Sequence, residues 1–175
     1  MTGLSPSNTY KYYVRQDCGV NGTSLWAGPY TFSTLCDVFV PYFAQDFQGT
    51  TFPPTCWSRG TGQLATPVTL TSTTSNWTQD DWRNVVTGDK AARLNIWSTG
   101  LYGWLFTPQI NLGAGAVSYQ LDFDLTLNAY GTSNPPATTG VDDKFAVVIS
   151  TDGGVTWSAA NTLRLWDNAG SAYVY

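Results

Sequence analysis

Apolar and polar side chains alternate along several short segments of the chain. The alternation covers residues 10–15, 28–36 and 117–128. A period of two residues is typical of half-buried strands in antiparallel sheets, because successive side chains point to opposite faces. Residues 144–150, KFAVVIS, are apolar on both faces, which predicts a strand that is covered on both sides.

Helical spacing is nearly absent from the same sequence. No i, i+3, i+4, i+7 pattern persists for three turns, and residues 80–88, DDWRNVVTG, could form one helical turn at most. Turn sequences rich in Gly, Pro and Asn separate the alternating segments, among them VNGTS, TFPPTC and TSNPPATTG. We therefore expect an all-β fold in which antiparallel strands form a sandwich.

A division of the chain is expected near residues 36–40. The residues before it hold three strands at most, which is too few for an independent β domain. The aromatic side chains of these strands would leave an apolar face uncovered. Either further strands precede Met1, or this hairpin packs on the remainder of the chain.

Composition narrows the chemistry that the chain can perform. Of its 175 residues 42% are apolar, enough for a sizeable core, and only 11% are charged. The chain has no histidine, and all twelve acidic residues are aspartate. A Ser-His-Asp or Cys-His constellation and a histidine-ligated zinc are therefore excluded within this chain. Carboxylate catalysis and metal binding through oxygen ligands remain open.

Charge and hydropathy argue against two kinds of partner. The net charge is −4 and no segment gathers several Lys or Arg, so we expect no nucleic acid. No apolar run approaches the roughly 18 residues of a membrane helix, so we expect no membrane insertion. The N-terminus lacks the charged and apolar segments of a signal peptide, so a signal for export would lie outside this chain.

The segment LSPSNTY places Leu4, Pro6 and Tyr10 at the spacing of a tyrosine corner. Together with YYVRQDCG and WAGPYTFST, it resembles the last third of a fibronectin type III domain. The resemblance implies that residues 1–36 are the C-terminal part of such a domain. It also implies that the Tyr10 hydroxyl bonds back to upstream backbone.

Four motifs follow in the rest of the chain: PYFAQDFQG, PPTCWSRG, DDWRNV and DDKFAVVISTDGGVTW. With them, residues 37–175 resemble the MAM-like, cleaved-adhesin-type domains of large secreted bacterial proteins. The resemblance implies an antiparallel jelly-roll β-sandwich, which this chain is expected to truncate at its C-terminus. Asp46, Phe47 and Gln48 stand where that family has Asp-Phe-Glu, so an amide replaces one carboxylate.

Part of the last motif also matches the Asp-box pattern Ser-x-Asp-x-Gly-x-Thr-Trp, known from sialidase propellers and from unrelated β proteins. The matching residues are Ser150, Asp152, Gly154, Thr156 and Trp157. An aspartate side chain can cap turn amides, and glycine permits positive φ. Propellers use the pattern once per blade, whereas it occurs once in this chain. We therefore interpret it as a structural turn.

Carboxylates at strand ends are candidate ligands for calcium, which takes about six to eight oxygens. The family resemblance suggests one structural calcium ion near Asp46, with Asp142 and Asp143 as sequence-distant partners. The alternative is that all three are solvated strand ends. Asp122 and Asp124 share a face, as a glycosidase pair would, but nothing in the sequence marks a cleft around them. The chain is therefore predicted to be no enzyme.

Eight tryptophans raise the question of carbohydrate binding, because sugars stack on flat aromatic faces. Trp77 and Trp82 lie in the polar stretch SNWTQDDWRN and are the candidate ligand-binding residues. Packing in the core or at its rim is the alternative for each of them.

The chain has three cysteines, so one thiol remains unpaired if the other two form a disulfide. We expect a disulfide between Cys36 and Cys56, which would close a loop of about 20 residues and contribute roughly 3 kcal/mol in the chain-entropy model. Cys18 could then have its partner before Met1. A disulfide would indicate an oxidising compartment.

These observations predict a non-catalytic module, secreted or at the bacterial cell surface, that serves adhesion or glycan or protein binding. The expected partners are a glycan or a surface protein, together with other domains of the same parent chain. An accessory domain of a secreted hydrolase or peptidase is one alternative, and a purely structural spacer is another.

Overall fold

The computed structural model describes residues 3–65, 68–72, 74–84, 88–115, 118–134 and 143–167. The fold is all-β, as the alternation predicts: 34% of residues lie in strands and 6% in short helical turns. No helix within those ranges is long and apolar enough to cross a membrane. The strands are β1 (Thr9–Val14), β2 (Ala27–Ser33), β3 (Ser58–Gln63), β4 (Thr69–Ser72), β5 (Trp77–Asp81), β6 (Lys90–Leu94), β7 (Gly103–Phe106), β8 (Lys144–Val148) and β9 (Thr162–Asp167).

Three single turns of 3-10 helix complete the regular structure of the described ranges. They are η1 (Gly19–Asn21), η2 (Trp82–Asn84) and η3 (Ala159–Asn161). The η2 turn lies within DDWRNVVTG, where the sequence allows one helical turn at most, but the positive φ of Arg83 and Asn84 shows that it is not a regular helical turn. The chain divides into two compact units, Met1–Val38 and Phe39–Tyr175, close to the division expected after residue 36.

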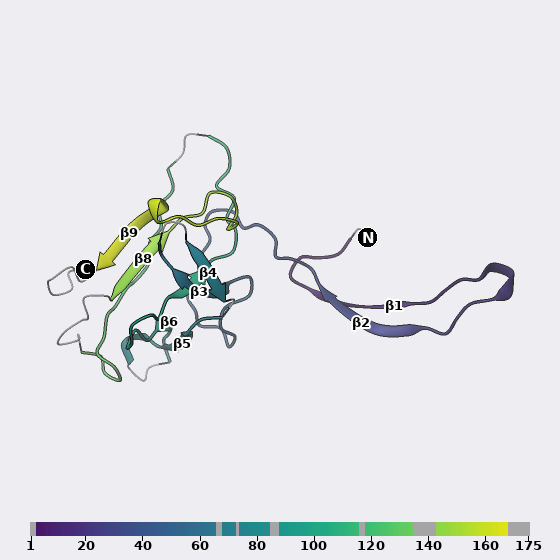
Figure 1. The fold of residues 1–175 in the computed structure, drawn as a ribbon, viewed down its shortest axis with the longest axis horizontal. Coiled ribbons are helices and arrows are strands. Elements are labelled where there is room, and N and C mark those ends of the chain that lie inside the picture. The colour runs from purple at the N-terminus through teal and green to yellow at the C-terminus, as the bar shows by residue number, and fades with distance from the viewer. Residues whose placement is uncertain are drawn as a thin grey trace. The chain divides into compact units, whose positions relative to one another are not determined.

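The first unit is a β-hairpin in which β1 pairs antiparallel with β2 (Figure 1). Tyr10 lies opposite Phe32, and Tyr12 lies opposite Tyr30. The ring centroids are 5.7 Å apart in the first pair and 5.4 Å apart in the second, so the aromatic residues form cross-strand pairs. Tyr12 and Tyr30 are still 41% and 48% exposed. The predicted alternation therefore gives an aromatic face that two strands alone do not cover.

Tyr10 fastens the chain upstream of the hairpin. Its hydroxyl accepts a hydrogen bond from the backbone N–H of Ser5 at 2.8 Å. The Thr34 hydroxyl donates to the carbonyl of Ser5 at 2.7 Å, and the N–H of Asn8 donates to the same Thr34 hydroxyl at 3.0 Å. The hydroxyl of Tyr10 thus bonds back to upstream backbone, which is the local geometry expected of a tyrosine corner.

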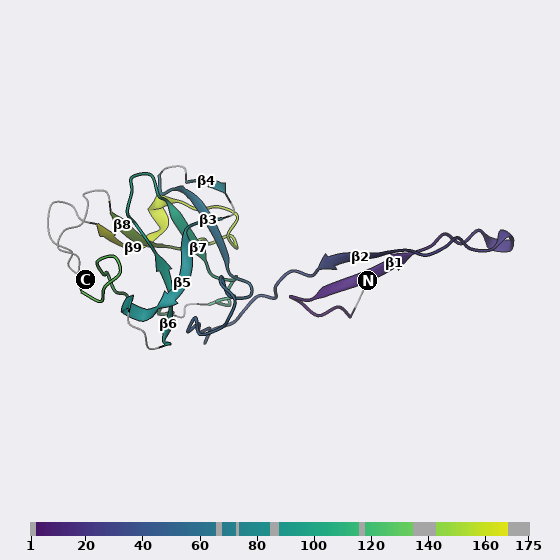
Figure 2. The same ribbon diagram turned by 90° about the horizontal axis from the view of Figure 1, so that it is seen from below.

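The second unit contains three groups of paired strands (Figures 1 and 2). The strand β3 lies between β4 and β7 in a three-stranded sheet, β5 pairs with β6, and β8 pairs with β9. Every one of these pairs is antiparallel. The β5–β6 hairpin lies beside β7. The loop after β8 contacts the same sheet through Trp157, whose ring packs against Trp104 and Phe106 in β7.

Aromatic side chains from distant segments form the core of this unit in three clusters. None of the hydrophobic side chains in the described ranges is fully buried, so the clusters are half-buried assemblies. Pairs of rings in each cluster have centroids 5.0–6.2 Å apart, a normal range for aromatic contacts. The clusters comprise Phe39, Phe43, Phe47, Phe52 and Trp57; Trp104, Phe106 and Trp157; and Phe123, Phe145 and Trp166.

The prediction of a strand over residues 117–128 is wrong. Residues 118–128 have no regular strand structure, and Val117 lies outside the described residues. Alternation identifies side chains that can share a face, but a strand also needs a partner ladder, and no described segment supplies one here. One part of the expected face still packs inward, because Phe123 contacts Phe145 and Trp166.

Cys36 and Cys56 are disulfide-bonded, which is the pairing expected from the sequence. Cys18 is an exposed free thiol near the tip of the β1–β2 hairpin. The disulfide closes the segment that carries most of the first aromatic cluster, so it restrains that cluster in the unfolded chain as well as in the folded one.

Candidate functional site

A cleft of about 630 Å³ lies at one end of the β4-β3-β7 sheet. Its described lining comes from β3 and β4, from Ala65 between them, from residues 75–76 and from residues 100–102. All eleven of these lining residues are uncharged. Most carry a hydroxyl or an amide, among them Thr61, Gln63, Thr69, Thr71, Asn76 and Tyr102.

A bulge and a glycine set the shape of the cleft floor. The register between β3 and β4 shifts between Thr61 and Gly62. At this shift the two backbones approach so closely that a Cβ atom on Gly62 would lie 2.0 Å from the carbonyl oxygen of Thr69. The indole N–H of Trp104 also donates to the Gly62 carbonyl at 2.7 Å. Only glycine fits this position, and it allows Gln63 and Thr69 to lie opposite each other.

Several polar groups of the floor keep free hydrogen-bonding capacity. The Gln63 side chain donates to the Tyr102 hydroxyl over a long 3.4 Å, and the Thr71 hydroxyl donates to the Thr61 carbonyl at 3.3 Å. The hydroxyls of Thr61 and Thr69 have no hydrogen-bond partner within the described part of the chain. A polar ligand would therefore find donors and acceptors that the protein itself does not use.

The opposite wall is fixed by hydrogen bonds to the neighbouring strands. The Ser75 hydroxyl donates to the carbonyl of Trp104 at 3.2 Å, and the Asn76 amide donates to the carbonyl of Asn95 at 3.0 Å. The Asn76 oxygen lies against Gly103, where a Cβ atom would be only 2.9 Å from it. These bonds hold the wall in place without adding charge to it.

The two tryptophans proposed for ligand binding do not belong to the described lining of the cleft. Trp77 is half-buried and packs toward Gly103, since its Cδ1 would be 3.3 Å from a Cβ atom there. Its indole N–H is buried and has no hydrogen-bond partner in the described residues. Trp82 is also half-buried, at the start of η2. Ligand binding by Trp77 and Trp82 stays a prediction.

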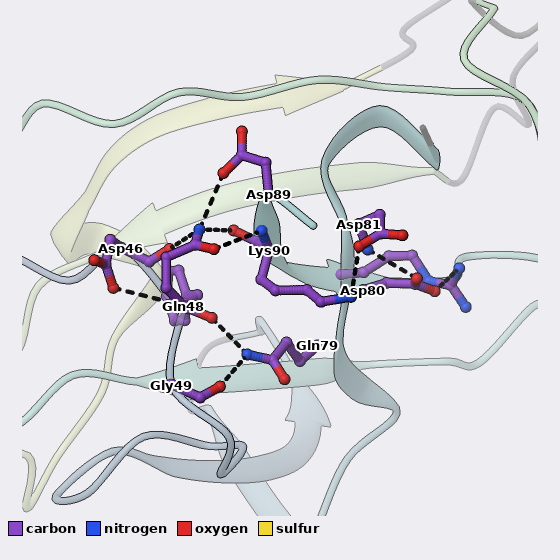
Figure 3. Close-up of polar contacts among 10 residues, drawn as sticks. Asp46, Gln48, Gly49, Gln79, Asp80, Asp81, Asp89 and Lys90 are labelled. Atoms are coloured by element: carbon purple, nitrogen blue, oxygen red, sulfur yellow. Dashed lines mark hydrogen bonds and ion pairs between the residues drawn. The ribbon is translucent and has the colours of Figure 1, made fainter. Parts of the chain in front are cut away.

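A second polar arrangement holds residues 46–49 against the β5–β6 hairpin (Figure 3). The Gln48 amide nitrogen donates to the carbonyl of Lys90 at 2.9 Å and to a carboxylate oxygen of Asp89 at 3.0 Å. The Gln48 amide oxygen accepts from the N–H of Lys90 at 3.0 Å. The Gln79 amide nitrogen donates to the carbonyls of Phe47 and Gly49 at 2.5 and 2.6 Å. We call Gln48 and Gln79 the glutamine clamp.

Two of the three carboxylates proposed as calcium ligands, Asp46 and Asp143, lie in the described residues. Asp46 accepts from the N–H of Gln48 at 3.0 Å, which closes a local turn (Figure 3). Asp142 lies outside the described residues, and Asp143 immediately precedes β8. In the ranges that the structure covers, no three acidic or cysteine side chains lie close enough together to hold a metal ion. Calcium binding stays a prediction, which a chelator-induced fall in Tm would support.

Charged side chains meet instead across the β5–β6 hairpin. Lys90 forms an ion pair with Asp81 at 2.5 Å, and Arg93 forms one with Asp80 (Figure 3). The hydrogen bond from Lys90 to Asp81 raises the pKa of the Lys90 ammonium group above its usual value, with the charges of both aspartates adding to the effect. The two ion pairs join the strands β5 and β6. None of their four residues belongs to the described lining of the cleft.

The Asp-box residues form a closed hydrogen-bonded turn. Asp152 accepts from the hydroxyls of Ser150 and Thr156 at 2.6 and 2.5 Å and from the N–H groups of Val155 and Thr156 at 3.1 and 3.0 Å. These donors, with the two hydroxyls the largest causes, hold the pKa of the Asp152 carboxyl well below its usual range. The carboxylate is thus saturated by local donors, which supports a structural role.

Trp157 connects that turn to the central sheet. Its ring centroid is 5.7 Å from that of Trp104 and 5.1 Å from that of Phe106, both in β7. The Gln109 amide donates to the carbonyl of Gly153 at 2.6 Å and fixes the other side of the turn. The motif therefore positions a loop on the sheet.

Comparisons with protein-family models, with curated proteins and with solved structures found no match for this chain.

The sequence predicts sites at aspartates and tryptophans, and it does not predict the cleft. A usable signal is present in TGQ and TLTS, two uncharged segments of neighbouring strands in which polar residues alternate with Gly62 and Leu70. Alternating polar residues predict one polar face. That signal could not identify Tyr102, which reaches the same face from a separate loop.

Proposed function

We propose that the chain is a non-catalytic module of a secreted or cell-surface protein and that it serves adhesion or glycan or protein binding. The observation that supports this function is the uncharged cleft beside β3 and β4. Its lining supplies hydroxyl and amide groups to a ligand, and the one titratable side chain in its described part is the Tyr102 phenol. General acid–base catalysis relies on groups whose pKa lies near the working pH, so such a lining favours binding over chemistry.

The finer assignment of the fold belongs to the same proposal. Residues 1–36 would be the final strands of a fibronectin type III domain, and residues 37–175 would form a MAM-like jelly roll. The hydrogen bond between Tyr10 and Ser5 supports the first assignment. The antiparallel strands of the second unit are compatible with the second, and glycan-binding loops and faces are common on such sandwiches.

The proposal is tested by exposing the 175-residue chain, labelled at Cys18, to a glycan array and to immobilised bacterial surface proteins. We expect saturable retention on members of one of these two sets. A chain that binds nothing would favour the structural spacer, and one that hydrolyses glycosides or peptides in the same assay would contradict a non-catalytic role. An accessory domain would show binding that matches the substrate of a neighbouring catalytic domain.

A further inference from the structure

We propose that the cleft binds an uncharged oligosaccharide, with one sugar ring against Tyr102 and its hydroxyl groups bonded to Gln63, Thr61 and Thr69. This inference rests on the proposed function and names the ligand class of the same cleft.

The described lining of the cleft carries no charge. An acidic sugar or a phosphate would lose water on binding and would need a cation to compensate, and the described lining contains none. The ion-paired Lys90 and Arg93 lie on the β5–β6 hairpin, where they are engaged with aspartates. The hydroxyl groups of an uncharged sugar can donate hydrogen bonds to the hydroxyl and amide groups of the lining and accept hydrogen bonds from them.

Tyr102 lies in the cleft with its ring accessible. The residue is 44% exposed, and its hydroxyl accepts a long hydrogen bond of 3.4 Å from the Gln63 amide. An accessible ring can receive the apolar face of a sugar, while the polar groups beside it take the hydroxyls. Leu101 is the single large aliphatic residue in the described lining, so the apolar surface of the cleft comes mainly from the Tyr102 ring and from the carbon atoms of small and polar residues.

The size of the cleft suits a small ligand. A volume of about 630 Å³ lies inside the range of about 300–1,000 Å³ that is typical of sites for small ligands. Gln63, Thr69 and Tyr102 are all exposed, so a longer glycan can continue from the cleft into solvent. A short neutral segment of a larger polysaccharide therefore fits the cleft better than a single ion does.

An extended peptide is the competing ligand, because β4 pairs with one neighbour in the described structure and could add a further strand. Peptides bound in this way gain affinity from main-chain bonds, and they need pockets for alternate side chains to be recognised specifically. The described lining offers seven side chains with a hydroxyl or an amide and one large aliphatic residue, Leu101, which favours the saccharide.

The test is a titration of the 15N-labelled chain with cellotriose, maltotriose and triacetylchitotriose, followed by NMR. Trigalacturonic acid serves as the acidic comparator. We expect at least one of the three uncharged trisaccharides to shift the amide signals of Gln63, Thr69 and Tyr102, and we expect the acidic sugar to leave them unchanged. The same titration with an unstructured Thr- and Val-rich peptide tests strand addition at β4.

Variants then separate the cleft from other exposed aromatics. Tyr102→Ala and Gln63→Ala should each lower the affinity about tenfold, the effect of losing one good stacking or hydrogen-bonding group. Tyr102→Phe should keep most of the affinity, because the ring remains. Tyr42→Ala removes a fully exposed tyrosine elsewhere and should leave binding unchanged. The NMR spectrum of each variant shows directly whether it has folded.

The outcomes distinguish this inference from the function on which it rests. Sugar-induced shifts confined to other residues, such as Trp82, would overturn the cleft as the site and would leave a glycan-binding module. Shifts caused by the peptide and by none of the sugars would overturn the saccharide and would leave a protein-binding module. If no probe shifts any signal and the arrays are blank, both the inference and the proposed function fail.

Discussion

A single carboxylate closes the turn that follows β8. Asp152 accepts bonds from Ser150, Val155 and Thr156, all within four residues of it. Because every partner is local, the sequence pattern alone was sufficient to predict this turn. Gly62 shows the opposite case, since its constraint comes from the backbone of Thr69 on another strand. No local pattern reports such a contact.

Replacement of Asp152 by a neutral residue should change how the stability of the chain depends on pH. The folded-state pKa of this carboxyl is lowered, so its contribution is present above the unfolded-state pKa of about 4 and is lost as pH falls through the lower folded-state pKa. We expect Asp152→Asn to lower Tm at pH 7, and we expect the difference from the native chain to shrink toward pH 2. Thermal melts at several pH values measure this.

Asp124→Asn is the matched control, because Asp124 is exposed and forms no hydrogen bond in the described ranges. The same loss of Tm in both variants would show that the local donors around Asp152 do not matter.

Replacement of Gly62 should damage the sheet and the cleft together. A methyl group at this position meets the Thr69 carbonyl oxygen, so the strands β3 and β4 must separate in Gly62→Ala. We expect a loss of about 1–3 kcal/mol in the free energy of unfolding, measured by denaturant titration. Gly49→Ala, where a Cβ atom would meet nothing within 4 Å, should cost far less. Equal losses in the two variants would contradict the close approach at Gly62.

Hairpins are the elements that the sequence predicts best. The pairing of β1 with β2 follows from two alternating segments and the turn between them, whose contacts are close in the sequence. Residues 118–128 alternate equally well and yet form no strand, because their pattern carries no information about a partner. The helix-poor composition predicts the fold class, and the strand partners remain undetermined until the sheet is known.

The hydrogen bonds of Gln48 in the glutamine clamp require a side chain that both donates and accepts, which an amide does. A glutamate could accept from the N–H of Lys90, but it could not donate to the Lys90 carbonyl, and it would face the Asp89 carboxylate. We expect Gln48→Glu to lower the free energy of unfolding by about 1 kcal/mol, since the residue is exposed and the lost bonds are partly replaced by water.

Gln16→Glu controls for the added negative charge, because the Gln16 side chain is exposed and unbonded in the described structure. Denaturant titrations of both variants should show a loss for Gln48→Glu alone. A gain in stability on adding calcium to Gln48→Glu would instead show that position 48 can complete a metal site.

At the scale of the whole molecule, the disulfide should be the largest single restraint. Closure of about 20 residues stabilises a folded chain by roughly 3 kcal/mol in the chain-entropy model. We expect the double replacement Cys36→Ser with Cys56→Ser to lower the free energy of unfolding by about that amount. Cys18→Ser removes the exposed thiol and should change little. A double variant as stable as the native chain would contradict the restraint.

The cleft is formed by several separate segments of the second unit, so its position cannot be predicted from any one segment of the sequence. Its walls come from β3, from β4, from residues 75–76 and from residues 100–102, and each segment alone is an ordinary polar stretch. Among the residues that the sequence singles out, Asp46 and Asp152 close local turns and Trp157 packs on β7, and none of the three lines the described cleft. Sites built from a few chemically distinctive residues can be predicted from composition, and sites built from common polar residues need the topology.

The edges of the β1–β2 hairpin bear on the solubility of the chain. Each of its strands pairs on one side in the described residues, so each presents an open row of N–H and C=O groups. Such rows can recruit strands from other molecules and start fibril growth. Lys11 lies within β1, and a lysine on an edge strand opposes this stacking because its charge would be repeated from copy to copy. The hairpin thus carries a safeguard against aggregation in its own sequence.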